Sequence, residues 1–292
     1  MKTALDVLRA GARWLEERGA DSPRYTMQCL LCHVLGCDRT RLYLEGDRPL
    51  AERELARLRE LLARRGRGEP LQHLTGGTEF YRRPFKTDGR ALVPRPETEE
   101  LAELALRLMP RRRGMRVLDM GAGSGVLGIT LALELTEFRP EVVLADISAE
   151  ALGLALENAA SLGARVNTVR SDLFSAWAGG SPLSLPDMFD VVLANLPYIP
   201  EGEELPPEVR CDPAAALYGG PLGTEIVGRF LREALPRLAP GAFVALEVGH
   251  DQGPRVLETM AALGYERLRL EKDLGGVPRF PLACAPSAPS MR

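Results

Sequence analysis

Apolar residues recur every three or four positions along the first 70 residues, which is the spacing of amphipathic helices. Two such sets are Leu5, Leu8, Ala12 and Leu15, and Leu55, Leu58, Leu61 and Leu62. Between them, Pro23 marks the start of a helix and Gly36 its end. The pattern predicts a small helical domain over residues 1–70 with no catalytic constellation of its own. We expect it to serve either in substrate recognition or as a structural cap.

From residue 71 the pattern changes, because Phe80, Tyr81 and Phe85 are mixed with polar residues as in a short hairpin. Pro94 and Pro96 then interrupt regular structure. The acidic residues that follow at 97 and 99 favour a helix start, since the helix dipole stabilises negative charge in the first turn. We expect residues 71–100 to form a hairpin and linker connector that also supplies a wall of the functional site.

Beyond residue 114, predicted strands and helices alternate. The strands are expected at 116–120, 141–147, 165–170, 189–195 and 241–249, and the helices at 124–135, 149–162, 223–238 and 254–263. Segments 266–273 and 279–284 are expected to close the sheet as an antiparallel pair. The pattern predicts an α/β fold over residues 101–284, with a doubly wound, mostly parallel seven-stranded sheet. Residues 285–292 predict a disordered tail.

The buried strand over 189–195 ends in Asn195-Leu196-Pro197-Tyr198, at the edge where open α/β sheets bind ligands. The Asn195 side chain has a carbonyl acceptor and an NH₂ donor. The Leu196 carbonyl offers a second acceptor, held outward because Pro197 disfavours a helical conformation before it. Two acceptors can hold a planar NH₂ group while Tyr198 packs on its face. This favours methyl transfer to an amide or aryl amine, driven by positioning rather than by a strong base.

A glycine-rich loop follows the first predicted strand and comprises Gly121, Ala122, Gly123, Ser124 and Gly125. Glycines let a ligand approach backbone amides at the start of a helix. The spacing of Gly123, Gly125 and Gly128 also satisfies the dinucleotide fingerprint, with Asp146 at the expected distance. A nicotinamide-dependent oxidoreductase therefore remains an alternative at this point.

Acidic residues at three successive strand ends favour S-adenosylmethionine as the cofactor. Asp119 suits an ammonium group and would repel a pyrophosphate, and Asp146 can accept both ribose hydroxyls. Asp172 offers an acceptor for the adenine amino group beside the apolar side chain of Leu173. The negative charge of three acids disfavours binding of an anion and favours binding of a sulfonium cation.

Composition changes this interpretation little. Apolar residues make up 45% of the 292 residues and charged residues 26%, the usual balance of a globular protein. The net charge of −3 divides into +5 over residues 1–90 and −8 over the remainder. The acidic second part disfavours a nucleic-acid substrate, since phosphate binding needs positive charge. Scattered arginines in the first part are expected to form solvated helix faces.

The cysteines and the absence of long apolar runs bear on location. Cys29 to His33 matches the c-type haem attachment pattern, but buried-helix residues surround it, and no second ligand pair suggests zinc. Five cysteines and no signal-like start argue against a disulfide framework. No apolar run is long enough to span a membrane. We expect a cytoplasmic protein without a metal site.

The motifs VLDMGAGSG, ADIS, SDLF and NLPY, in this order, resemble those of class I methyltransferases that act on planar amino groups. The segment LQHLTGGTEFYRRPFKTDGRALVPRPETE is similar to the connector of the peptide chain release factor glutamine N5-methyltransferases. Residues 215–230 and 246–253 are similar to that family as well. The family usually has proline at the position of Leu196. A leucine at this position also resembles the adenine-dimethylating enzymes of ribosomal RNA.

The resemblance implies transfer of a methyl group from S-adenosylmethionine to the glutamine side chain of a Gly-Gly-Gln loop in release factors. It places the cofactor against the glycine loop, Asp146, Leu173 and Asn195, and the glutamine amide against Asn195, Leu196, Pro197 and Tyr198. We expect a monomeric enzyme that takes a release factor as its protein substrate and no nucleic acid. Methylation of a ribosomal-protein glutamine or of adenine N6 in RNA or DNA are the alternatives, and a non-catalytic adaptor would not need the intact site.

Overall fold

The computed structural model describes residues 2–180 and 185–287, and the chain divides into two compact units. The first unit comprises Met1–Thr78, Thr87–Gly89 and Leu205–Cys211. The second comprises Glu79–Lys86, Arg90–Glu204 and Asp212–Arg292. The loop segment 205–211 thus packs with the helical part of the chain although it lies far away in sequence.

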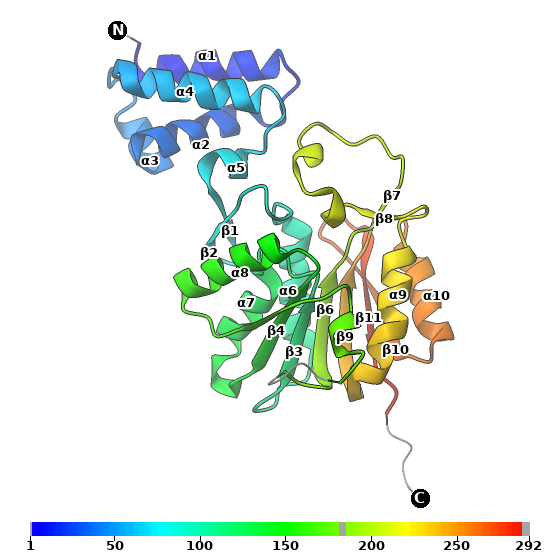
Figure 1. Cartoon of the computed structure of the whole chain (residues 1–292). Coiled ribbons are helices and arrows are strands. Elements are labelled where there is room, and N and C mark those ends of the chain that lie inside the picture. The colour runs from blue at the N-terminus through cyan, green and yellow to red at the C-terminus, as the bar shows by residue number, and fades with distance from the viewer. Residues whose placement is uncertain (1, 181–184, 288–292) are drawn as a thin grey trace, which may run out of the picture. The chain divides into compact units, whose positions relative to one another are not determined.

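The first unit is helical, as the apolar spacing predicts. Its helices are α1 (Ala4–Glu16), α2 (Pro23–Leu35), α3 (Arg39–Leu44), α4 (Glu52–Arg65) and α5 (Leu71–Thr75) (Figure 1). Gly36 ends α2 in the left-handed conformation that glycine adopts without strain. Helix α5 lies in the segment that was predicted as hairpin and linker. The sequence pattern did not predict this helix, because five residues are too few to show a helical period.

Helices α1 and α2 approach closely around a small apolar core. A Cβ atom at Gly11 of α1 would lie 2.4 Å from the sulfur of Met27 in α2, so a larger residue there would displace the Met27 side chain. Leu8, Leu30 and Leu61 are almost fully buried in the same core. Cys29 and Cys32 are free, partly buried thiols on α2, in agreement with a packing role.

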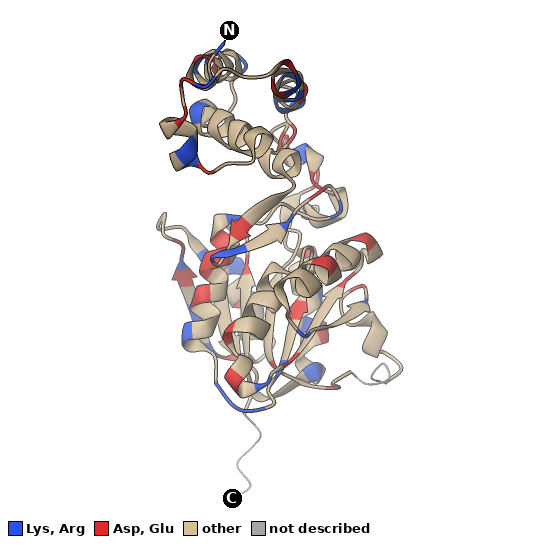
Figure 2. Ribbon diagram, turned by 90° about the vertical axis from the view of Figure 1, so that its left-hand side faces the viewer, with Lys and Arg blue, Asp and Glu red and all other residues tan. Residues whose placement is uncertain are grey.

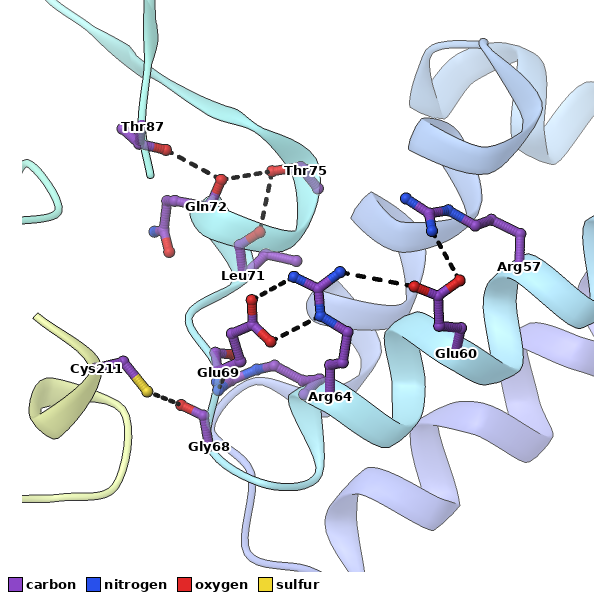
Figure 3. A network of polar contacts seen from close by, with 11 residues as sticks. Arg57, Glu60, Arg64, Gly68, Glu69, Leu71, Gln72, Thr75, Thr87 and Cys211 are labelled. Atoms are coloured by element: carbon purple, nitrogen blue, oxygen red, sulfur yellow. Dashed lines mark hydrogen bonds and ion pairs between the residues drawn. The ribbon is translucent and has the colours of Figure 1, made fainter. Parts of the chain in front are cut away.

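Polar contacts fasten the end of α4 within this unit (Figure 3). Arg64 binds Glu69 through two hydrogen bonds and lies 3.8 Å from Glu60. The buried Arg65 guanidinium donates to Glu208 at 2.7 Å, and this ion pair ties α4 to the segment 205–211. Charged residues of both signs are interspersed along α1 and α4, as expected for solvated helix faces, whereas another helix of this unit carries almost none (Figure 2).

The second unit starts with the predicted hairpin and continues as alternating strands and helices. The hairpin strands are β1 (Gly77–Phe80), whose first residues belong to the first unit, and β2 (Arg83–Lys86). The sheet strands are β3 (Arg116–Met120), β4 (Glu141–Asp146), β5 (Asn167–Arg170), β6 (Phe189–Asn195), β9 (Leu238–Glu247), β10 (Glu266–Lys272) and β11 (Pro278–Cys284). The helices are α6 (Pro96–Leu108), α7 (Val126–Glu134), α8 (Ala149–Leu162), α9 (Glu225–Ala234) and α10 (Gly253–Ala262). Two short strands, β7 (Ile199–Pro200) and β8 (Tyr218–Gly220), pair outside the sheet.

Seven of the described strands form one sheet in the order β10-β11-β9-β6-β3-β4-β5. Strands β5, β4, β3, β6 and β9 run parallel, and β11 is antiparallel to both of its neighbours. Helices α6, α7 and α8 cover one face of this sheet, and α9 and α10 cover the other (Figure 1). The predicted fold class is confirmed.

Several element bounds differ from the prediction by one to four residues, and the helix predicted over 223–238 covers only Glu225–Ala234 as α9. Strand β9 begins at Leu238 rather than at 241, because the register against β6 shifts and Gly241 takes a positive φ within the strand. The predicted disordered tail starts too early, since Ala285 is buried and its N–H donates to the Ala242 carbonyl. The rest of the predicted tail, from residue 288, lies outside the described residues. Within the described ranges, no helix combines the length and apolar character needed to cross a membrane.

Candidate functional site

The carboxyl ends of the central parallel strands surround a cavity of about 320 Å³. Strands β3 and β6 are neighbours there, at the point where the strand order reverses and open α/β sheets bind ligands. Most of the predicted site residues line this cavity: Asp119, Gly121, Ala122, Gly123, Ser124, Asp146, Asp172, Leu173, Asn195, Leu196 and Pro197. Gly125 and Tyr198 are not among its lining residues.

The loop between β3 and α7 is folded tightly by its glycines. Gly121, Gly123 and Gly125 all have positive φ angles, and Gly125 is the residue that precedes α7. The Gly121 N–H donates to the Ala145 carbonyl at 2.8 Å, so the loop is held against the end of β4. The loop therefore presents its backbone to the cavity in a conformation that side chains larger than hydrogen would strain.

Asp119, the last polar residue of β3, is the most deeply buried acid of the cavity. Its Oδ2 accepts a hydrogen bond from the Gly128 N–H at 2.8 Å. Its Oδ1 is buried and has no hydrogen-bond partner within the described residues. Burial, together with the nearby Asp146 carboxylate, raises the pKa of Asp119 to about 7. Asp119 is thus an unsatisfied acceptor that faces the cavity.

Asp146, at the end of β4, is held by backbone donors. Its two oxygens accept hydrogen bonds from the N–H groups of Gly123 at 2.9 Å and Ser148 at 2.8 Å. Burial raises the pKa of this carboxyl group as well. Because each carboxylate oxygen carries two lone pairs, both atoms can still accept a bond from a ligand.

The third strand-end acid, predicted as an acceptor for the adenine amino group, has a charged partner in the structure. Asp172 is half exposed and forms an ion pair with Arg229 of α9, which also lines the cavity. Leu173 beside it is buried and has a positive φ of 46°, a conformation that a leucine adopts only under constraint. The Ser171 hydroxyl donates to the Leu173 carbonyl, and this bond helps to hold the turn.

Asn195 is part of a buried hydrogen-bonded chain that the sequence patterns did not indicate. Its Nδ2 donates to the Thr98 hydroxyl at 3.0 Å, and the Thr98 hydroxyl donates to Glu247 Oε2 at 2.7 Å. Thr98 lies in the first turn of α6, and Glu247 is the last residue of β9. The similarity of residues 246–253 to a known family was a signal for Glu247, but it assigned no role.

Tyr198, which the NLPY motif predicts to pack on the face of the substrate group, is not among the residues that line this cavity. Burial raises the pKa of its phenol to about 12, and Glu247 and Arg279 are among the charges that act on it. Its carbonyl accepts a hydrogen bond from Gln252 Nε2 at 2.7 Å. A Cβ atom at Gly223 would lie 2.2 Å from that carbonyl oxygen, so the glycines near β8 allow this loop to pack on the motif.

A partly buried ion pair holds the loop that precedes β8. The Asp212 carboxylate accepts hydrogen bonds from the Val93 N–H at 3.1 Å and from Arg95 at 2.7 Å. Arg95, between the two prolines of the connector, thus has a defined ionic partner. The residues that follow Asp212 reach the cavity, and Pro213, Ala215, Ala216 and Tyr218 line it. His250 is exposed and is not among the lining residues.

The fold and the strand-end site define a methyltransferase of the class I type, and comparison with known proteins agrees. The family described as "Methyltransferase small domain" matches residues 97–208, and the "PrmC N-terminal domain" family matches residues 6–76. A solved methyltransferase from Pyrococcus furiosus shares the fold, with a TM-score of 0.51 and 20% identity over 81% of this chain and 100% of that one.

Curated relatives then define the family. The Koribacter versatilis (strain Ellin345) protein named "Release factor glutamine methyltransferase" is 38% identical over 291 residues, which cover 99% of each chain. The protein of the same name from Rhodopirellula baltica is 37% identical over 289 residues, or 95% of each chain. The chain belongs to the release factor glutamine methyltransferase family.

Proposed function

We propose that this protein transfers a methyl group from S-adenosylmethionine to the side-chain amide nitrogen (N5) of a glutamine in the Gly-Gly-Gln loop of a peptide chain release factor. The observation that carries the proposal is the placement of Asn195 and Asp119 on neighbouring strands of one cavity. One offers an amide matched to a planar NH₂ group, and the other offers a carboxylate matched to a cation. The names of the relatives support the choice of substrate.

The residues of the cavity fit S-adenosylmethionine. The buried Asp119 Oδ1, which lacks a partner within the described residues, can accept from the ammonium group. Asp146 would accept from the ribose hydroxyls, and Asp172 with Leu173 would border the adenine ring. Gly121, Ala122, Gly123, Ser124 and Gly125 would supply the close-fitting backbone. When bound, the cofactor supplies an electrophilic methyl group on a positively charged sulfur.

The motif at the end of β6 would prepare the substrate nitrogen. An amide nitrogen is a poor nucleophile because its lone pair is delocalised into the carbonyl group. Asn195 Oδ1 and the Leu196 carbonyl oxygen would each accept one N–H of the glutamine, which fixes the nitrogen and favours pyramidalisation. Pro197 holds the Leu196 carbonyl outward. Because these acceptors are weak bases, they act by orientation and preorganised polarity.

The division of the chain supports separate tasks for its parts. We propose that the helical first unit and the connector recognise the release factor, while the second unit binds the cofactor and carries out the transfer. Tyr198, which does not line the cavity, would act on the substrate side of the motif. We further propose a monomeric cytoplasmic enzyme without a nucleic-acid substrate.

Methyl transfer can be tested with labelled S-adenosylmethionine and three acceptors: a release factor, its Gln→Ala loop variant, and RNA. We expect label only in the unaltered release factor. Label in RNA would favour adenine methylation, and label retained by the loop variant would exclude the proposed glutamine.

The role of Asn195 can be tested separately with Asn195→Ala. This variant is expected to lose transfer while cofactor binding largely persists. Asn167→Ala, at an exposed position of β5, is the matched control and should retain full turnover. Normal turnover of Asn195→Ala would refute its assigned role.

A further inference from the structure

Asn195 and Glu247 lie side by side in the sheet, and Thr98 connects them. The two residues pair in register at the ends of the parallel strands β6 and β9. Paired residues of parallel strands point to the same face, and this is the face that α6 covers. Thr98, in the first turn of α6, is 3% exposed and bridges both side chains through its hydroxyl group.

The direction of the hydrogen bonds follows from the number of protons. An ionised carboxylate can only accept, so Glu247 takes the single hydroxyl proton of Thr98. The Thr98 oxygen is then left as an acceptor, and it takes an N–H of Asn195. The Glu247 carboxylate also lies within hydrogen-bonding range of Asn195. With its NH₂ group turned toward this pair, the Asn195 amide leaves its carbonyl oxygen as the atom available to a ligand.

The charges that face Glu247 come from each element packed around it. Glu97 on α6 disfavours the ionised form, while Arg279 on β11 favours it, and the Tyr198 phenol lies near the same groups. Arg279 is itself held by Asp273 at 2.8 Å. Burial is the largest effect, and it raises the pKa of Glu247 to about 7. The protonation of this carboxyl group therefore changes within the neutral pH range.

We propose that Glu247, acting through Thr98, fixes the orientation of the Asn195 amide so that Oδ1 faces the substrate nitrogen. Thr98 and Glu247 are positioning residues in this proposal, which rests on the proposed glutamine methylation. A protonated Glu247 can donate a hydrogen bond to the Thr98 oxygen instead of accepting one. Thr98 can then donate to Asn195, and this favours the flipped amide, whose NH₂ group would repel the substrate NH₂ group.

The kinetic test compares Thr98→Val, Thr98→Ser and Glu247→Gln at saturating cofactor. Loss of one preorganised acceptor lowers kcat by roughly 10- to 100-fold in Thr98→Val, and Thr98→Ser should return to within about threefold of the unaltered enzyme. Thr130→Val is the matched control, because Thr130 is also fully buried on a helix of this unit and its hydroxyl has no partner in the described ranges. It should leave kcat unchanged.

The pH profile separates positioning from general stability. The kcat of the unaltered enzyme should fall about tenfold per pH unit below pH 7. This decrease is the acidic limb of the pH profile, and the profile of Glu247→Gln should lack it. Asp190→Asn is the control for a buried carboxyl group at the opposite end of β6, where Asp190 binds Arg116. It should retain the limb. Equal kcat in Thr98→Val and the unaltered enzyme, or an unchanged limb in Glu247→Gln, would overturn the proposal.

An NMR experiment tests the same chain without any turnover. In protein labelled with ¹⁵N-asparagine and bound to S-adenosylhomocysteine, the Asn195 side-chain NH₂ signals should titrate near pH 7. They should stop titrating in Glu247→Gln and shift in Thr98→Val but not in Thr130→Val. Signals that ignore both substitutions would refute the positioning role. If no glutamine substrate is methylated, the proposed function fails while this experiment still decides the orientation of Asn195.

Discussion

Replacing Asp119 with asparagine should weaken cofactor binding and stabilise the free protein at the same time. Burial raises the pKa of Asp119 from 3.8 to about 7, and a shift of about three units corresponds to about 4 kcal/mol. Because the folded state binds this proton more tightly than the unfolded state, the carboxyl group costs stability as the pH rises from about 4 to 7. Above pH 7 the charged form therefore predominates against a free-energy cost.

Asp119→Asn removes this cost but leaves a buried NH₂ group without its best partner, which costs about 1–3 kcal/mol. The variant should thus be about 1–3 kcal/mol more stable than the unaltered protein at pH 8 and lose the advantage near pH 4. Urea denaturation at both pH values measures the difference. Lower stability of the variant at pH 8 would contradict the reasoning.

The same titration should appear in cofactor affinity. Since an ammonium group requires the ionised carboxylate, the Kd for S-adenosylhomocysteine should rise about tenfold per pH unit below pH 7 in the unaltered protein. Loss of a charge-assisted hydrogen bond should weaken binding of Asp119→Asn about 10- to 100-fold at pH 8, with little pH dependence. Calorimetry between pH 5.5 and 8 measures both. A flat profile for the unaltered protein, or the same slope in the variant, would show that Asp119 does not bind the ammonium group.

Three further substitutions test other parts of the site. Gly128→Ala places a Cβ atom 2.2 Å from Leu144 Cδ2, so it should cost about 1–3 kcal/mol of stability in urea denaturation and weaken cofactor binding. No loss of either would mean that α7 shifts freely. Asp212→Asn removes the charge that pairs with Arg95, whose side chain is 30% exposed, and we expect a loss of about 1–3 kcal/mol together with faster proteolysis of the loop before β8; equal proteolysis would contradict the role of this ion pair. Leu196→Pro keeps the backbone carbonyl, so initial rates should change less than about threefold while the smaller buried side chain costs about 1 kcal/mol. A large fall in rate would show that the leucine side chain itself contributes.

The elements nearest the site could be predicted from local patterns. Strand β6 and helix α8 have the predicted bounds, because a continuous apolar run defines the strand and Ser148 and Gly163 cap the helix. The meeting of Asp119 and Asp146 at one edge also follows, since parallel strands present their carboxyl ends together.

The side-chain partners could not be predicted in this way. Thr98 and Glu247 are 149 positions apart, and no period or spacing relates them. The pairing of Asp172 with Arg229 likewise depends on how α9 packs against the strand ends. Such contacts are set by register and helix packing, which one sequence does not encode in a local pattern.

The pairing of β3 with β6 also sets the distance between Asp119, proposed to bind the cofactor, and Asn195, proposed to bind the substrate. Asp119 pairs with Leu193, two residues before Asn195, so Asp119 and Asn195 share a face and are offset by about 7 Å along the strands. One inserted residue in β6 would turn Asn195 to the opposite face. Changes in chain length between relatives should therefore fall in the loops, because an insertion within a strand would change the register and the face of every residue after it.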